Sequence, residues 1–260
     1  MTMPFMLRAC LGALVTACLV ALYGPLTLTV AASVLPIHAD RPEWSGVTFA
    51  YYGQLFHDHD VLVALVNTLI VGLCAVAASL VLGTAFAFHY HFGRGVLREI
   101  HQFLIFVPFL MPPIVTGIAL LIFFREIGLD RSLVTVVIGH TLLVLALVYR
   151  TLLQRLQTLN PNLIEASFDL GAGRIETFRR ILLPHLATAA IAGGVLAFAL
   201  SFDETLVTLL VTGTDSTLPL RLWAMMRTGY TPDINALVTL VLVGSTILCL
   251  TVARLLRVKF

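Results

Sequence analysis

Two adjacent carboxylates, Asp203 and Glu204, are the only acids inside a long apolar stretch of this sequence. Acids at that depth usually face the interior of a helical bundle and mark the route of a solute or an ion. Neighbouring side chains of a helix point about 100° apart, so the two carboxylates cannot face one point. We expect one of them to line a path and the other to pair with Arg221 or Arg227. A salt-bridged pair at the membrane interface is the alternative.

Prolines concentrate in another apolar stretch, which reads PFLMPPIVTG from Pro108 to Gly117. Proline removes a helical hydrogen-bond donor and clashes with the preceding turn, so Pro108, Pro112 and Pro113 should kink or open a helix here. Gly117 would allow close packing or close access of a solute. A flexible wall of a translocation path and a structural kink filled by neighbouring side chains both fit this pattern.

No residue pattern of an enzyme is visible. The sequence has no GxxxxGK[ST] phosphate loop, so this chain is not expected to hydrolyse ATP. No nucleophile is paired with a base, and no cofactor is expected. The run from His57 to Asp60 holds two histidines and two aspartates, which we expect to cap the next helix and not to bind a metal. The four cysteines fall in apolar stretches and are expected to be free thiols.

The composition is that of a membrane protein. Of the 260 residues, 59% are hydrophobic and 12% are charged, and the mean hydropathy is +0.98. A soluble domain carries about 25% charged residues, so these are too few to cover a water-facing surface. Long apolar runs predict helices, because a helix satisfies its own backbone groups in lipid. We predict an all-α protein with a single membrane domain over residues 1–260 and six transmembrane helices, at about 9–35, 61–88, 103–124, 133–149, 186–211 and 235–253.

The distribution of positive charge predicts the orientation. With the N-terminus inside, eleven of the 16 Lys and Arg residues fall in cytoplasmic segments, whereas ten of the 14 acids fall on the outer side. Positive residues favour the cytoplasmic side, so both termini are expected to be cytoplasmic. The uncharged run from Ala9 to Ile37 is about twice as long as a signal-peptide core of roughly 7–15 residues, so we expect a retained first span.

The longest predicted cytoplasmic loop has a helical pattern of its own. Asn160 and Pro161 form a helix-start signal, since Asn caps a helix and Pro suits its first position. Gly171 and Gly173 should end or bend this first helix. A second helix with an apolar stripe should follow, and Pro184 is expected to break the pattern before the fifth span. Such a loop packs either against its own domain or against a partner protein.

This loop resembles the EAA loop of ATP-binding-cassette (ABC) importers, in which Glu-Ala-Ala, Gly and Ile-x-Leu-Pro recur at fixed spacings. Every spacing matches, with Ser167 where the family usually has Ala. The resemblance implies that residues 160–184, here termed the EAA loop, dock on a cytoplasmic ATPase subunit. Glu165 would supply a polar contact, Ala166 and Ser167 would allow close approach, and Gly171 would make the bend. The matching positions are Glu165, Ala166, Ser167, Gly171, Ile181, Leu183 and Pro184.

A second resemblance covers nearly the whole chain. The segments PFLMPPIVTGIALLIFF and ALSFDETLVTLLVTGTDSTLPLRLWAMMRTGYTPDINAL look like those of spermidine/putrescine-type permeases. That resemblance implies the type I importer permease fold, the bacterial inner membrane, and three partners: an ATPase dimer, a second homologous permease subunit and a periplasmic solute-binding protein. The segment 212–234 is expected either to dock the binding protein or to plug the pore. Nucleic acid is not expected as a partner.

The resemblance and the two acids together predict a polyamine or another small organic cation as the solute. Ferric iron, phosphonates, opines and thiamine are alternatives, since related permeases carry them. A secondary ion-coupled transporter is the rival class, but it would have inverted repeats, broken helices with polar residues at the middle of the membrane, and no EAA loop. The residues predicted to lie on the translocation path are Pro112, Pro113, Gly117, Asp203 and Glu204.

Overall fold

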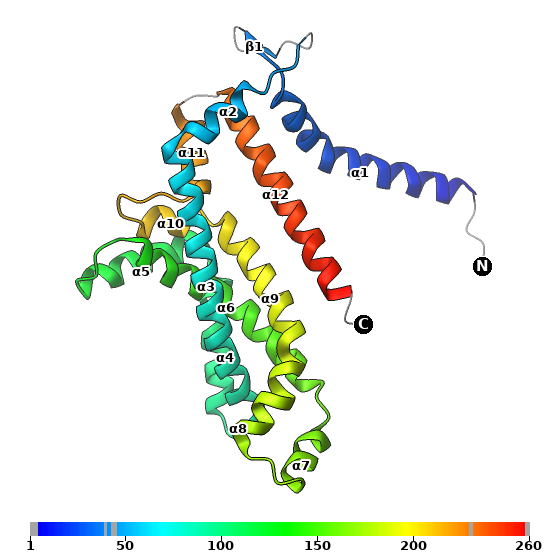
Figure 1. Cartoon of the computed structure of the whole chain (residues 1–260), viewed down its shortest axis with the longest axis vertical. Helices are drawn as coiled ribbons and strands as arrows, with labels where there is room; N and C mark the ends of the chain where they lie inside the picture. Colours follow the sequence, from blue (N-terminus) through cyan, green and yellow to red (C-terminus); the bar gives the residue numbers. More distant parts are fainter. Residues whose placement is uncertain (1–4, 39–40, 43–45, 229–230, 258–260) are drawn as a thin grey trace. The chain divides into compact units, whose positions relative to one another are not determined.

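Helices account for nearly all of the computed structural model, which describes residues 5–38, 41–42, 46–228 and 231–257 (Figure 1). A short antiparallel pairing joins β1 (Ile37–His38) to β2 (Arg41–Pro42). The prediction of an all-α membrane protein is confirmed. The helical elements are α1 (Phe5–Ala32), α2 (Ala50–His57), α3 (His59–Phe92), α4 (Leu97–Leu110), α5 (Pro113–Glu126), α6 (Leu133–Gln157), α7 (Pro161–Asp169), α8 (Arg174–Thr177), the π-helical turn η1 (Phe178–Leu182), α9 (Leu183–Asp203), α10 (Leu206–Val211), α11 (Leu218–Thr228) and α12 (Pro232–Arg257).

The chain divides into two compact units. The first comprises residues up to Leu62 together with Leu222–Ile247, and the second comprises Val63–Arg221 and the residues from Leu248 onward. In the first unit, the hydroxyl groups of Ser33 and Tyr52 are hydrogen bonded at 2.7 Å. The second unit contains both candidate sites. The prediction of one membrane domain over the whole chain stays a prediction.

Four helical stretches of the described chain are long and apolar enough to cross a membrane: Leu7–Ala32, His59–Phe92, Leu133–Gln157 and Arg174–Asp203. The pair α4 and α5 would make a fifth span, although the chain bends by 108° between them. The predicted sixth span coincides with a shorter apolar helix, Pro232–Leu248. These spans agree with a polytopic fold, but the third and fifth predicted spans are both interrupted.

The third predicted span, 103–124, is broken at its paired prolines. Met111 and Pro112 separate α4 from α5 and are extended, with ψ angles of 146° and 134°. A residue that precedes proline is pushed out of the helical region, and both of these residues precede one. Pro108 is accommodated inside α4. Of the two outcomes expected here, a kinked or an opened helix, the structure has the opened one.

The fifth predicted span, 186–211, is also discontinuous, which corrects its expected extent. Helix α9 ends at Asp203, Glu204 is extended, and the chain becomes helical again at Leu206. The Thr205 hydroxyl donates to the Asp203 carbonyl at 3.3 Å. Such local bonds compete with the helical ones, which favours a break in this polar segment. The two acids lie at the end of a helix and not inside one.

Pro184 was expected to interrupt the helix but does not end it. The helix is continuous over Arg174–Asp203 and passes through the π-helical turn η1 just before Leu183 and Pro184. Proline has no N–H for the carbonyl one turn earlier, and its ring crowds that carbonyl. The preceding turn widens to the looser i→i+5 pattern, which lets the helix continue.

Helix α6 is the centre of the second unit, because α4, α5, α9 and α10 all pack on it. One core cluster joins α6 to α9 and includes Tyr149, Leu152, Leu156, Leu186 and Ala189. Another joins α5, α6 and α10 and includes Phe124, Val136, Val207 and Val211. This packing holds both helix breaks against α6.

Candidate functional site

A cavity of about 160 Å³ lies where the two helix breaks come together. Its walls come from the α4–α5 break, from the middle of α6 and from the end of α9. Non-helical backbone at membrane depth is tolerated where it lines a cavity or is buried in protein. The space is termed the break cavity, and its lining residues are Phe109, Met111, Pro113, His140, Leu143, Val144, Leu200, Ser201 and Glu204.

Glu204 lines the break cavity, whereas Asp203 does not. The Oε1 atom of Glu204 accepts a hydrogen bond from the Val207 N–H at 2.9 Å, which caps the start of α10. Both acids line a separate hollow of about 430 Å³ against Leu147 and Leu196. The two acids therefore share this hollow, and of the two Glu204 alone also lines the break cavity.

Among the described residues of the second unit, the ion pair expected between one of these acids and Arg221 is not formed, and the pairing with Arg227 stays a prediction. In the part of the chain that the structure describes, neither Asp203 nor Glu204 takes part in a salt bridge. In the first unit, the Arg227 guanidinium lies over the Trp223 ring, 4.1 Å from its centre. A carboxylate beside a cavity attracts positively charged groups.

Three polar residues to which no sequence pattern pointed form a hydrogen-bonded network at the break cavity, and two of them, His140 and Ser201, line it. His140 of α6 is 2% exposed, and its Nδ1 and Nε2 are each 2.8 Å from a hydroxyl oxygen, of Ser201 and Thr208 respectively. The Thr208 hydroxyl donates to the Glu204 carbonyl at 3.0 Å. This chain of bonds joins α6 to both sides of the α9–α10 break. Screening apolar stretches for histidine as well as for acids would have found His140.

The other predicted path residues have separate roles. Pro112 forms the α4–α5 break, and Pro113 lines the break cavity. Gly117 packs against α10, where a Cβ would lie 2.7 Å from Leu210 Cδ1 and 3.3 Å from Val207 Cα. The missing side chain sets the distance between α5 and α10. A role for Gly117 in a solute path stays a prediction.

The EAA loop begins with α7, and the sequence explains both of its ends. The Asn160 side chain caps the first turn, and Pro161 takes the first helical position. At the other end Gly171 has a φ of +84°, and the Ala172 N–H donates to the Ser167 carbonyl at 3.0 Å. Glycine adopts this left-handed helix cap without steric cost. The bend predicted at Gly171 is present.

The Ser167 side chain makes a hydrogen bond within the EAA loop. Its hydroxyl is hydrogen bonded to the Thr177 hydroxyl at 2.8 Å, and both side chains are buried. The bond joins α7 to α8 across the turn. Glu165 and Ala166, which precede Ser167, are exposed and available to a partner.

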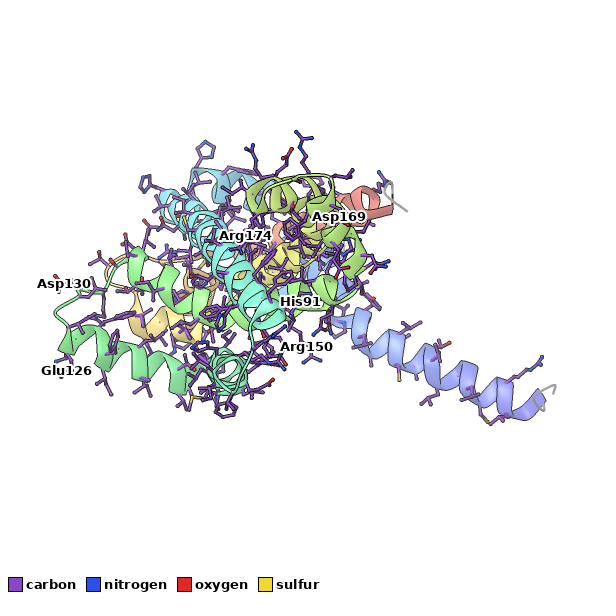
Figure 2. The ribbon with its side chains drawn as sticks, turned by 90° about the horizontal axis from the view of Figure 1, so that it is seen from below. His91, Glu126, Asp130, Arg150, Asp169 and Arg174 are labelled. Atoms are coloured by element: carbon purple, nitrogen blue, oxygen red, sulfur yellow. The ribbon has the colours of Figure 1, made fainter. Side chains whose placement is uncertain are left out.

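The outer surface of the EAA loop is apolar around its turn. Leu170 is 89% exposed and Ile175 is 77% exposed. Figure 1 shows α7 and α8 at one end of the second unit, and Figure 2, seen from that side, shows Asp169 and Arg174 beside this turn. Large apolar side chains at the tip of a loop indicate an interaction surface.

The last part of the EAA loop, where the chain re-enters the helical bundle, is fixed by packing and by hydrogen bonds. Ile181 packs against the core cluster of α6 and α9, while Leu183 is half exposed. The Arg155 Nε donates to the His185 carbonyl at 3.1 Å, and the His185 Nε2 lies 3.0 Å from the Arg155 carbonyl. This reciprocal pair fastens the start of α9 to the end of α6. A displacement of the EAA loop must therefore move both helices.

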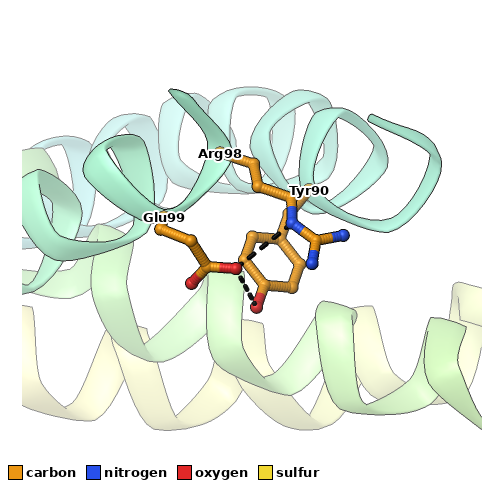
Figure 3. A network of polar contacts seen from close by, with 3 residues as sticks. All are labelled: Tyr90, Arg98 and Glu99. Atoms are coloured by element: carbon orange, nitrogen blue, oxygen red, sulfur yellow. Dashed lines mark hydrogen bonds and ion pairs between the residues drawn. The ribbon is translucent and has the colours of Figure 1, made fainter. Parts of the chain in front are cut away.

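Two further polar clusters have local roles. Near the end of α3, the Glu99 carboxylate binds the Arg98 guanidinium at 3.2 Å and the Tyr90 hydroxyl at 3.3 Å, and this network leads into α4 (Figure 3). In the first unit, the Asp58 carboxylate accepts from the Val61 N–H at 3.2 Å and caps α3, as expected. Among the described residues, no group of three or more His, Cys, Asp or Glu could hold a metal ion.

A helical bundle with a cavity between broken spans and an exposed loop at one end has the architecture of a transport subunit. Solved structures share this fold. A chain of a bacterial ABC transporter involved in the import of the acidic polysaccharide alginate is similar over 97% of this chain and 95% of its own, with a TM-score of 0.75 at 16% identity. A chain of the MetNI methionine ABC transporter covers 82% of this chain and all of its own, with a TM-score of 0.64 at 17% identity.

Residues 79–259 match the family of binding-protein-dependent transport system inner membrane components, and the chain belongs to this family. The Escherichia coli (strain K12) putrescine transport system permease protein PotI is 35% identical over 207 residues, which are 76% of this chain and 74% of PotI. The spermidine/putrescine transport system permease protein PotC of that strain is 30% identical over 253 residues, which are 95% of this chain and 94% of PotC. The subunit is thus an ABC importer permease, and members of its family are transport components and not enzymes.

Proposed function

We propose that this permease imports a polyamine or a similar small organic cation, with the break cavity as part of its path. The observation that carries the proposal is Glu204, a carboxylate without a salt-bridge partner in the described chain, which lines a cavity between two broken helices. At about 4 Å and an effective dielectric of about 20, a carboxylate attracts an ammonium group by about 4 kcal/mol. The similarity to putrescine and spermidine/putrescine permeases supports the same class of solute.

The EAA loop is proposed to dock on a cytoplasmic ATPase subunit. The exposed apolar tip at Leu170 and Ile175 and the exposed Glu165 are suited to a protein partner. The sequence lacks a phosphate loop, so the energy has to come from a separate pair of ATPase subunits. A second permease subunit completes the membrane part of the proposed importer, and a periplasmic binding protein delivers the solute.

The proposed orientation places both termini and the EAA loop in the cytoplasm. The test is labelling of whole cells with a membrane-impermeant thiol reagent after Gly173→Cys or Asp130→Cys, each in a chain without its native cysteines. Gly173 is exposed with open space around its Cβ position, and Asp130 is exposed beyond the end of α5 (Figure 2). We expect labelling at position 130 and none at 173. The opposite pattern would invert the orientation.

The solute is tested by ATP-dependent and binding-protein-dependent uptake of radiolabelled putrescine into proteoliposomes that contain the assembled importer. Glu204→Gln keeps an oxygen to cap α10 but removes the charge, so uptake should fall at least tenfold, which corresponds to a loss of about 1.4 kcal/mol. Asp203→Asn is the matched control and should have a smaller effect, because Asp203 does not line the break cavity. Unchanged uptake in Glu204→Gln, or an anionic or neutral solute on the binding protein, would contradict the proposal.

A further inference from the structure

The hydrogen bonds around His140 determine which atoms of the cavity wall donate and which accept. Thr208 has a single hydroxyl proton and donates it to the Glu204 carbonyl at 3.0 Å. Toward His140, 2.8 Å away, the Thr208 oxygen can then only accept. The Nε2 atom of His140 must therefore carry a proton.

The same reasoning continues to Ser201 on the other side of the ring. In the described chain no carboxylate is hydrogen bonded to His140, so an imidazolium here would be a buried charge without a partner, which is costly. A neutral imidazole has one N–H, and this leaves Nδ1 as a bare acceptor. The Ser201 hydroxyl, 2.8 Å from Nδ1, must donate to it. The Ser201 oxygen can then only accept further hydrogen bonds.

We propose that His140 is a positioning residue that turns the polar wall of the break cavity into a surface that only accepts hydrogen bonds. Both nitrogens of the His140 ring are already engaged, so the polar side-chain groups left to bind a solute are the Ser201 oxygen and the Glu204 carboxylate. The remaining lining side chains are apolar. Such a wall matches the N–H groups of primary and secondary ammonium ions. A phosphonate or a carboxylate would find no side-chain donor there.

This inference rests on the proposed function. It identifies the group of the solute that the cavity recognises, which is the N–H of an ammonium ion. A site that pairs its buried polar groups with a solute discriminates strongly against solutes that leave those groups unpaired. If His140 carried its proton on Nδ1 instead, Ser201 would have to accept from the ring and could turn its own proton into the cavity. The selectivity of the wall therefore depends on which nitrogen of one ring is protonated.

The protonation pattern can be measured directly and without any solute. The permease is labelled with 15N-histidine in the assembled importer, and the His140 signals are identified by their loss in His140→Gln. We expect a protonated Nε2 and an unprotonated Nδ1 in the 15N spectrum. A proton on Nδ1, whether alone or together with one on Nε2, would overturn the proposal.

A double-mutant cycle on putrescine uptake tests whether His140 acts through Ser201. The amide nitrogen of His140→Gln can still donate to Thr208, but nothing replaces Nδ1, so the Ser201 proton is released. We expect His140→Gln and Ser201→Ala each to lower the maximal uptake rate by about three- to tenfold, as for the loss of one hydrogen bond. The double variant should be no slower than Ser201→Ala alone.

Thr141→Val is the matched control for a merely structural effect on α6. Among the described residues the Thr141 hydroxyl bonds only to the Val137 carbonyl, at 2.7 Å, and Thr141 does not line the break cavity. The fold reductions in putrescine uptake caused by Thr141→Val and by Ser201→Ala should multiply in the double variant. If the effects of His140→Gln and Ser201→Ala multiply in the same way, His140 only supports the fold and the proposal is wrong. If the 15N pattern is as expected but no variant or wild type transports putrescine, the wall is as inferred and the proposed solute is wrong.

Discussion

The EAA loop and the break cavity are constructed in opposite ways. Within the EAA loop, the hydrogen bond that joins its two helices connects residues ten positions apart, Ser167 and Thr177. At the cavity, His140 is bonded to residues 61 and 68 positions away. The loop exposes apolar side chains, whereas the cavity buries polar ones. A surface for another protein can be encoded in one short segment, but a site for a solute has to be assembled from several helices.

The two regions are nevertheless mechanically linked, because α6 and α9 contribute to both. The Arg155–His185 bonds fix one end of this helix pair, and the His140–Ser201 bond fixes it nearer the cavity. No residue of the EAA loop lines the break cavity, so changes in the EAA loop should affect coupling to the ATPase and leave solute selectivity intact. Changes at the cavity should have the reverse effect.

The largest expected effect is that of Gly171→Val on transport. Gly171 has a φ of +84° with open space around its Cβ position, so the penalty comes from backbone strain and not from crowding. A left-handed conformation costs an L-residue about 1–2 kcal/mol, and a β-branched residue is a genuine outlier there. We expect insertion into the membrane but no detectable ATP-dependent uptake.

Gly173→Val is the control for Gly171→Val. Gly173 is extended with a φ of −75° and also has open space, so valine should fit with nearly normal uptake. Normal uptake in Gly171→Val would show that the bend is not needed. Equal losses in both variants would mean that the surface of the turn matters and its backbone does not.

Leu170→Asp should have the next largest effect. Leu170 is 89% exposed, so the change should not destabilise the subunit, but burial of a leucine at an interface is worth about 1.5–3 kcal/mol. Co-purification with the ATPase subunit should weaken by about tenfold or more. Val96→Asp, at a residue 74% exposed outside the EAA loop, should leave it unchanged. Similar losses in both variants would remove the distinction between the EAA loop and other exposed segments.

This difference in construction explains what the sequence could reveal. The Asn160 cap, the Pro161 start and the Gly171 bend each depend on neighbours in sequence, and all three are present. The apolar runs likewise predict the helices, because a chain in lipid has to satisfy its own backbone hydrogen bonds. The network of His140 could not be derived, because nothing in a sequence states which helices pack side by side.

The breaks and continuations of helices were predicted less well, since tertiary packing decides them. Three prolines predicted a kinked or opened helix, but the break lies at Pro112, just before α5 begins at Pro113, and Pro108 lies inside α4. The helix continues through Pro184 because the turn before it is π-helical, and this turn packs on α9 and the core. No proline or glycine marks the break after Asp203, so an apolar run with two acids in it resembled a continuous span.

Gly117→Val probes the packing behind the break cavity and should have a moderate effect. A Cβ at Gly117 would meet Leu210 and Val207, so valine must push α10 away from α5. Overpacking of this kind costs about 1–3 kcal/mol. We expect a lower thermal midpoint and reduced putrescine uptake, with ATPase association unchanged. Gly244→Val, at a helical glycine with open space, is the control, and equal losses in both variants would rule out a specific contact.

The smallest expected effect is that of Ser167→Ala, which restores the small residue usual at this EAA position. The change leaves the Thr177 hydroxyl, buried within the loop, with only its 3.2 Å bond to the Gly173 carbonyl. Loss of one hydrogen bond costs about 1 kcal/mol. Amide exchange across the turn should quicken about fivefold, while uptake changes little.

The double variant Ser167→Ala, Thr177→Val decides whether that hydroxyl pair holds the turn. When both partners become apolar, no buried donor or acceptor lacks a partner, and such replacements are often nearly neutral. Amide exchange in the double variant should therefore be slower than in Ser167→Ala alone. Faster exchange, with the two effects adding, would show that each hydroxyl acts through its own backbone bond, to the Ile164 and Gly173 carbonyls. The turn would then be held by two independent caps, each joining residues much closer in sequence than either side-chain hydrogen bond of His140 does.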